Sequence, residues 1–132
     1  GVWVSKLNNC DYCFDHHFSG LKRLLNDDNK SQKIRQAINL NEIEKAPLSK
    51  AQKMAMQYSR ILTKDPSRVS EAMIIELRDL GYTDGEILEI NQVTAYFSYA
   101  NRTVLGLGCS TDGDIIGLSP GNSQDPNDWG HS

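Results

Sequence analysis

Apolar residues recur at three- and four-residue steps along most of the chain, and this spacing predicts amphipathic helices. The first clear helix is expected from Asp11 to about Leu25. Its apolar face is expected to hold Phe14, His17, Leu21 and Leu24. The residues before it, GVWVSKLN, have no initiator Met and read as part of a helix already begun, so we expect the natural N-terminal region to extend further.

Polar residues at 26–29 break the pattern, and a short helix is predicted from Ser31 to about Leu40. Ser49 is placed to cap the following helix. Pro66 is expected to end that helix, and Ser70 to cap the next. Predicted apolar faces in this region are Ile34, Ala37 and Ile38 in the short helix, and Ala51, Met54, Ala55, Tyr58, Ile61 and Leu62 in the longer one.

The last long helix is predicted from Asp84 to about Leu107. Gly81 is a typical C-terminal stop of the helix before it, and Thr83 with Glu86 forms a capping-box pattern. The expected core face of the last helix is Ile87, Ile90, Val93, Phe97, Ala100 and Val104. No alternating β pattern or internal repeat is present. We therefore expect a single all-α domain over residues 1–132, with an irregular tail from 108 to 132 laid on a surface and Trp129 as an apolar anchor.

Composition narrows the class of protein. The 132 residues suit one domain, and the net charge of −3 gives no basic patch for nucleic acid. No apolar run is long enough to cross a membrane, and no signal peptide is visible. Three cysteines without a secretory signal argue against a disulfide-stapled secreted scaffold. These observations favour a cytoplasmic protein with no nucleic-acid or membrane partner.

The segment NNCDYCFDHHFSG brings four potentially reactive side chains close together in the sequence: Cys10, Cys13, His16 and His17. If Cys10 opens the helix, a three-residue step places the two sulfurs one turn apart on one face. The free N–H groups and the dipole at a helix start favour a thiolate. His17, one turn after Cys13, is placed to accept its proton. The pattern therefore predicts a redox-active dithiol with Cys10, Cys13 and His17 as its catalytic residues.

Two other interpretations of the same residues remain open. Zinc uses these residue types, with a fourth ligand from His16, Cys109, His131 or a carboxylate, but no second ligand pair is present. Alternatively, the two cysteines and His17 are simply core residues. His16 points away from His17 on a helical wheel and is expected to be a partly exposed polar residue. Cys109 is expected to be a free, inert thiol.

The segment SKLNNCDYCFDHH resembles the redox motif of the alkylhydroperoxidase D and carboxymuconolactone decarboxylase superfamily. It is most similar to the branch described as uncharacterised peroxidase-related enzymes. LRDLGYTDGEILEINQVTAYFSYANRTVLGLG is similar to the last helix pair of that branch, and DPNDWGHS to its C-terminus. The decarboxylases of the superfamily lack the paired cysteines, so the resemblance points to its peroxidase side.

This resemblance implies an all-α homo-oligomer, such as a dimer, trimer or hexamer, with its active site near a subunit interface. It implies that Cys13 attacks a hydroperoxide, that Cys10 forms the disulfide and that His17 relays protons. A dithiol protein or small thiol would return the electrons, and no metal or other cofactor is implied. The family's relay glutamate would lie upstream of Gly1. The histidine that alkylhydroperoxidase D carries before its second cysteine is here Tyr12, whose phenol is no base at neutral pH. The implied relay is therefore simpler. A disulfide reductase, a redox sensor and a zinc-binding helical oligomer are the alternative functions.

Overall fold

The computed structural model describes residues 1–113 and 116–117, and within them every regular element is a helix. The all-α prediction is therefore confirmed. The elements of this part of the chain are α1 (Val2–Leu7), α2 (Asp11–Leu25), α3 (Asp28–Asn39), the 3-10 helix η1 (Ile43–Lys45), α4 (Lys50–Lys64), the 3-10 helix η2 (Pro66–Arg68), α5 (Glu71–Asp79) and α6 (Asp84–Gly106).

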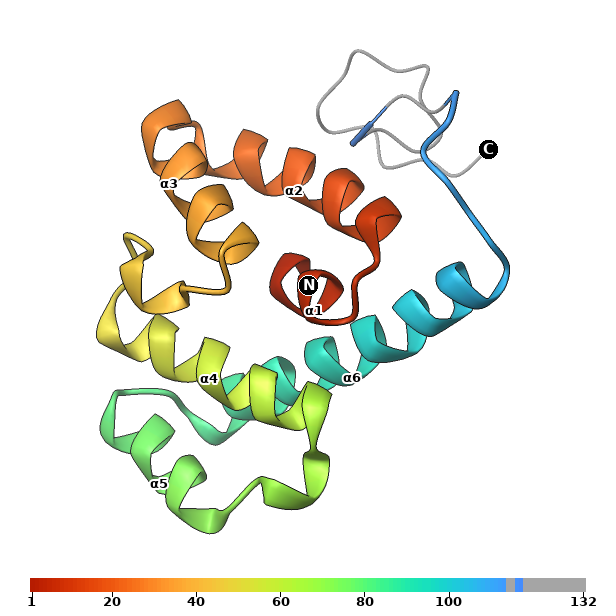
Figure 1. Cartoon of the computed structure of the whole chain (residues 1–132). Helices are drawn as coiled ribbons and strands as arrows, with labels where there is room; N and C mark the ends of the chain where they lie inside the picture. The colour runs from red at the N-terminus through yellow and green to blue at the C-terminus, as the bar shows by residue number, and fades with distance from the viewer. Residues whose placement is uncertain (114–115, 118–132) are drawn as a thin grey trace.

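The short helix α1 lies at the centre of the arrangement (Figure 1). It contacts α2 and α3 on one side and α4 and α6 on the other. Helix α5 packs against α4 and α6 at the far end of the molecule from α2. Although α1 has only six residues, five of them are buried, including Trp3 and Val4. The indole N–H of Trp3 donates to the backbone oxygen of Met56 on α4 at 3.0 Å, which ties the two halves together.

The core consists of two apolar clusters, and α1 belongs to the first. The first joins α1, α2, α3 and η1 through Val2, Trp3, Leu7, Phe14, Phe18, Ile34, Ala37, Ile38, Ile43 and Ala46. The second joins α4, α5 and α6 around Tyr58, Leu77 and Ile87. Arg35 covers the first cluster, with its guanidinium over the rings of Phe14 and Phe18, and pairs with Asp15 at 2.7 Å. This contact fixes α3 against α2.

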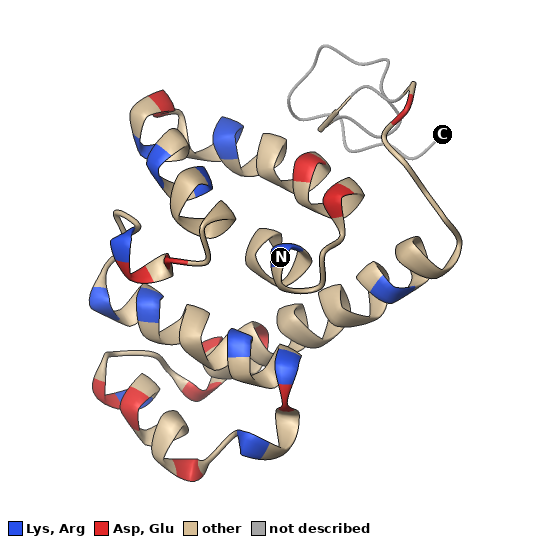
Figure 2. Cartoon of the chain, viewed as in Figure 1, with Lys and Arg blue, Asp and Glu red and all other residues tan. Residues whose placement is uncertain are grey.

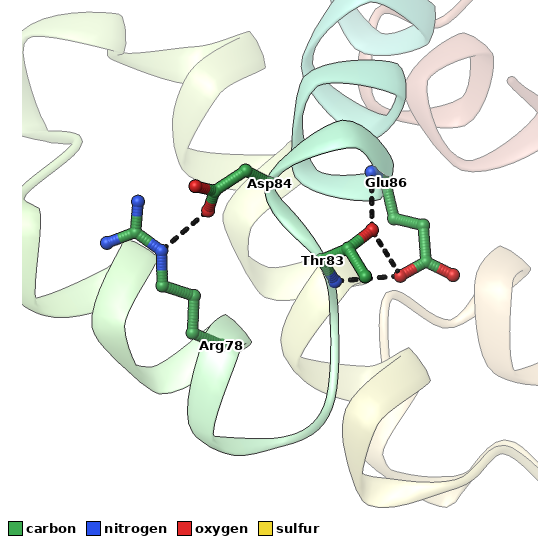
Figure 3. Close-up of polar contacts among 4 residues, drawn as sticks. All are labelled: Arg78, Thr83, Asp84 and Glu86. Atoms are coloured by element: carbon green, nitrogen blue, oxygen red, sulfur yellow. Dashed lines mark hydrogen bonds and ion pairs between the residues drawn. The ribbon is translucent and has the colours of Figure 1, made fainter.

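Several predicted helix ends are confirmed in detail. Ser49 and Thr83 each form a complete capping box, with Gln52 and Glu86 as the reciprocal partners. Gly81 has a φ of +101°, and the N–H of the following Tyr82 bonds the oxygen of Leu77, so α5 ends in a Schellman motif. Figure 3 shows the resulting corner, where Arg78 of α5 also pairs with Asp84 of α6 at 2.7 Å.

The structure corrects two predictions about where and how helices begin. Helix α3 begins at Asp28 rather than Ser31, because Asp27 caps it by accepting the N–H of Lys30. Only two residues, one of them Asn26 in the left-handed region, therefore separate α2 from α3. Ser70 occupies the N-cap position of α5 but makes no side-chain capping bond.

The predicted apolar faces of α2 and α6 are partly wrong. On α2, Leu24 is 80% exposed and His17 is exposed, while Phe18 is buried beside Phe14. On α6, Val93 is 46% exposed. The fully buried line of α6 is instead Ile87, Thr94 and Asn101, residues seven apart and therefore on one helix face. Two of the three are polar, so apolar periodicity alone did not find them.

Charged side chains are spread over α2 to α5, whereas the middle of α6 carries none (Figure 2). None of the described helices has both the length and the apolar character needed to cross a bilayer. After α6, the described residues 107–113 and 116–117 form no helix. Trp129 lies outside the described residues.

Candidate dithiol site

Cys10 is placed by the way α1 ends. The N–H of Asn9 bonds the oxygen of Lys6, and the N–H of Cys10 bonds the oxygen of Ser5 at 2.9 Å. Asn9 has a φ of +56°, the left-handed conformation that this Schellman motif requires and that Asn tolerates better than most residues. Cys10 is at once the last residue of that motif and the N-cap of α2. The prediction that Cys10 opens the helix is confirmed.

Both cysteines of the motif are free thiols, and both are buried. Cys10 is 1% exposed and Cys13, in the first turn of α2, is 5% exposed. The helix brings these two side chains together at the junction of α1 and α2. Cys109 follows α6 and is a free, exposed thiol. The arrangement presents one protected dithiol and one separate surface thiol.

The expectation that the helix start favours a thiolate fails for Cys10. The pKa of Cys10 is raised to about 11, mainly by burial and also by the hydrogen bond with the Cys13 side chain. The backbone N–H of Cys13 acts in the opposite direction, and the charge of Asp11 raises the pKa again. Loss of solvation outweighs the favourable field of the helix end here. At neutral pH Cys10 is therefore protonated.

His17 lies on the exposed side of α2 and turns its ring toward α6. Its centroid is 4.7 Å from that of Phe97, with the rings at 83°. Loss of solvation on the side of its ring that faces α6 lowers the pKa of His17, and the neighbouring His16 lowers it further. The imidazole is thus neutral at pH 7 and able to accept a proton. Among the described residues, no hydrogen bond joins His17 to Cys13, so its role in a relay stays a prediction.

His16 occupies the neighbouring face of α2 and is half-buried. Its ring lies 4.6 Å from that of Tyr12, and its Nδ1 accepts the N–H of Gly117 at 3.3 Å. Arg23 donates to the oxygen of the same glycine at 2.9 Å. A Cβ at Gly117 would approach the Ser19 hydroxyl to 2.2 Å, so only glycine fits there. These contacts hold Gly117 against α2, close to the turn that bears Cys13.

A polar network that the sequence did not predict lies beneath the cysteines. Asn101 of α6 is fully buried; its amide donates to the Ser5 hydroxyl at 3.1 Å, and its oxygen accepts from the Asn8 amide at 3.1 Å. Ser5 is fully buried too, and its backbone oxygen accepts the Cys10 N–H. The only feature of the sequence that could have indicated the burial of Asn101 is its position, seven residues after Thr94 on the buried face of α6.

A cavity of the described residues lies elsewhere, between α1, α4 and α6. Its volume is about 440 Å³, and it is largely apolar with Glu86 and Glu89 among its lining residues. Neither Cys10, Cys13 nor His17 lines it. The dithiol is therefore not at the bottom of this cavity, and a substrate that reached the sulfurs would have to be small or would have to approach from another side.

The geometry of the described residues does not support the zinc interpretation. Within residues 1–113 and 116–117, no three side chains of His, Cys, Asp or Glu are gathered where they could hold a metal ion. Cys109 is not gathered with Cys10 and Cys13 in such a group. His131, another suggested ligand, lies outside the described part of the chain.

The similarity of this chain to known proteins is found at the level of the fold. No family model matches the sequence, and no curated protein matches it. Among solved structures, an uncharacterized peroxidase-related protein from Silicibacter sp. TM1040 has a similar fold, with a TM-score of 0.74 and 27% sequence identity. The match covers 83% of this chain and 55% of that one, so this chain spans about half the length of its structural neighbour. The chain thus has the helical fold of a peroxidase-related protein, and membership of the alkylhydroperoxidase D superfamily stays a prediction.

Proposed function

We propose that the protein is a thiol-dependent peroxidase that reduces hydrogen peroxide or an organic hydroperoxide with the Cys10–Cys13 pair. The observation that carries this proposal is the placement of two free, buried thiols across the first turn of α2. The similarity in fold to a protein described as peroxidase-related agrees with it.

The reaction would begin at Cys13. Its thiolate attacks one oxygen of the hydroperoxide, the O–O bond breaks, and the products are an alcohol or water and a Cys13 sulfenic acid. In this proposal His17, whose lowered pKa leaves the imidazole able to accept a proton, takes up the proton that Cys13 loses. Cys10 then attacks the Cys13 sulfur, so that a disulfide forms and water leaves. A dithiol protein or small thiol reduces the disulfide by exchange and is itself oxidised.

The different surroundings of the two cysteines favour Cys13 as the residue that attacks the peroxide and Cys10 as the residue that then forms the disulfide. The raised pKa keeps Cys10 protonated, and a protonated thiol is a poor nucleophile toward peroxide. Cys13 lies one turn further, in the first turn of α2. Because both sulfurs are buried, a small hydroperoxide reaches them more easily than the disulfide of a folded protein does.

A disulfide reductase or redox sensor would use the same dithiol without meeting peroxide. Such a function needs a partner's disulfide to contact Cys13, which is 5% exposed. The burial therefore supports the peroxidase more strongly than these two alternatives, and thiol–disulfide exchange completes the cycle of the peroxidase.

Stopped-flow oxidation of the reduced protein tests the proposal. Hydrogen peroxide and an alkyl hydroperoxide are mixed in turn with the unaltered chain, with Cys13→Ser and with Cys109→Ser. We expect consumption of one peroxide for each dithiol in the first and third proteins and none in the second. Cys109→Ser is the matched control, because it removes an exposed thiol outside the pair.

Two results would overturn the assignment. One is peroxide consumption by Cys13→Ser at the rate of the unaltered chain. The other is a reduced protein that reacts with small disulfides but with neither peroxide.

A further inference from the structure

Asn101 is the only residue of α6 with a fully buried amide side chain in the described part of the chain, and burying an amide costs free energy unless its hydrogen bonds are made. Both of its polar atoms are bonded, and both bonds reach the segment that ends in Cys10. The amide nitrogen donates to Ser5 and the oxygen accepts from Asn8, each at 3.1 Å.

The partners of Asn101 control where Cys10 lies. Ser5 accepts the Cys10 N–H through its backbone oxygen, and its hydroxyl donates to the oxygen of Gly1. Asn8 is the C-cap of α1 and begins the turn that continues through Asn9 to Cys10. Asn101 therefore holds both the start of this turn and the residue that receives its last hydrogen bond. Lys64 of α4 adds a third tether by donating to the oxygen of Leu7.

From this geometry we propose that Asn101 is a positioning residue for the dithiol, which fixes the α1–α2 turn so that Cys10 stays within disulfide-forming reach of Cys13. The inference rests on the proposed redox use of the pair and deepens it. Cysteine pairs form a disulfide only when their Cα and Cβ atoms meet narrow distance limits, so freedom in the turn lowers the effective concentration of one thiol at the other.

The test is an equilibrium between the protein and glutathione, which needs no peroxide. Glutathione disulfide accepts two electrons from the Cys10 and Cys13 thiols and becomes two glutathione thiols, while the protein forms its disulfide. The equilibrium constant is measured in a Cys109→Ser background by trapping thiols at several glutathione ratios. The variants are Asn101→Ala, which removes both bonds, and Asn8→Ala, which removes one.

Thr94→Val is the matched control. Thr94 is also a buried polar residue on the core line of α6, but it bonds Ser59 of α4 at 3.0 Å, away from the cysteine turn. We expect the disulfide of Asn101→Ala to be about tenfold less favoured, which corresponds to the loss of one to two hydrogen bonds. Asn8→Ala is expected to shift the constant about threefold in the same direction. Thr94→Val is expected to lower the melting temperature with less than about a twofold change in the constant.

Equal shifts in Asn101→Ala and Thr94→Val, or no shift in either asparagine variant, would overturn the inference. If Asn101→Ala does not fold, Asn8→Ala decides alone: an unchanged equilibrium constant rejects the positioning role. A protein that forms the disulfide normally but ignores peroxide refutes the proposed function and leaves the role of Asn101 standing. A protein that forms no Cys10–Cys13 disulfide at any ratio refutes both.

Discussion

His17 of α2 stands edge-on to Phe97 of α6, with ring centroids 4.7 Å apart and an angle of 83° between the rings. The phenyl ring takes the place of water on that side of the imidazole, and burial is the largest cause of the lowered His17 pKa. The contact also joins the helix that bears the cysteines to the helix that bears Asn101. Phe97 thus influences the proton affinity of a residue on another helix.

We expect nuclear magnetic resonance titration to place the pKa of His17 below the ordinary value of 6.5. Phe97→Ala should raise this pKa, because it returns water to the ring, whereas Phe97→Leu should change it less. Since the folded state binds this proton less readily than the unfolded state, the contribution of His17 to stability is present above pH 6.5 and falls as the pH drops toward its folded pKa. A His17 pKa at or above 6.5 in the unaltered chain would contradict this account.

The raised pKa of Cys10 gives a second pH-dependent prediction. In a Cys13→Ser, Cys109→Ser chain, thiolate absorbance at 240 nm reports Cys10 alone. Burial remains in that variant, so we expect a midpoint above the ordinary value of 9, although lower than the value of about 11 given by the intact pair. A group whose pKa is raised by folding stabilises the folded state below pH 9 and loses that contribution as the pH rises toward 11. A midpoint below 9 would show that the helix field outweighs burial.

The sequence predicted local features well because their causes are local. The cap at Ser49, the capping box at Thr83 and the glycine stop at Gly81 each depend on a few neighbouring residues, and the structure contains all three. The start of α2 after Cys10 follows the same logic. The predicted start of α3 is wrong because the polar run at 26–29 has the composition of a break, although Asp27 is itself a good N-cap.

The sequence could not predict features that depend on which helices meet. Asn101 reads as a surface residue, yet it is buried because Ser5 and Asn8 approach it from α1 and the linker. The burial that raises the pKa of Cys10 depends in the same way on the packing of α1 beneath α2. The helix dipole does act to lower the pKa of Cys10. Desolvation raises this pKa by more, and desolvation depends on tertiary packing.

The corner between α5 and α6 predicts a measurable difference between two capping positions. Thr83 makes a complete capping box with Glu86, whereas Ser70 makes no side-chain bond at the start of α5. Thr83→Ala should therefore lower the free energy of unfolding by about 1 kcal/mol, and Ser70→Ala by much less. Urea unfolding followed by circular dichroism measures both. Equal losses in the two variants would mean that the bonds drawn in Figure 3 do not stabilise the helix.

The uncharged middle of α6 leads to the last prediction, which concerns the expected homo-oligomer. Tyr96 is 62% exposed and Tyr99 is 69% exposed, next to the half-exposed Val93, and residues 90–101 carry no charge (Figure 2). Tyrosine is enriched at the energetically dominant positions of protein interfaces. Because this surface adjoins Phe97, a second copy bound there would lie beside His17.

We therefore expect light scattering to find an oligomer. The double variant Tyr96→Glu, Tyr99→Glu should raise the dissociation constant of this oligomer by about 100-fold or more. Leu24→Glu, which alters an 80% exposed apolar residue on α2, is the control and should leave the assembly unchanged. A monomeric unaltered chain, or equal weakening by Leu24→Glu, would reject α6 as the interface.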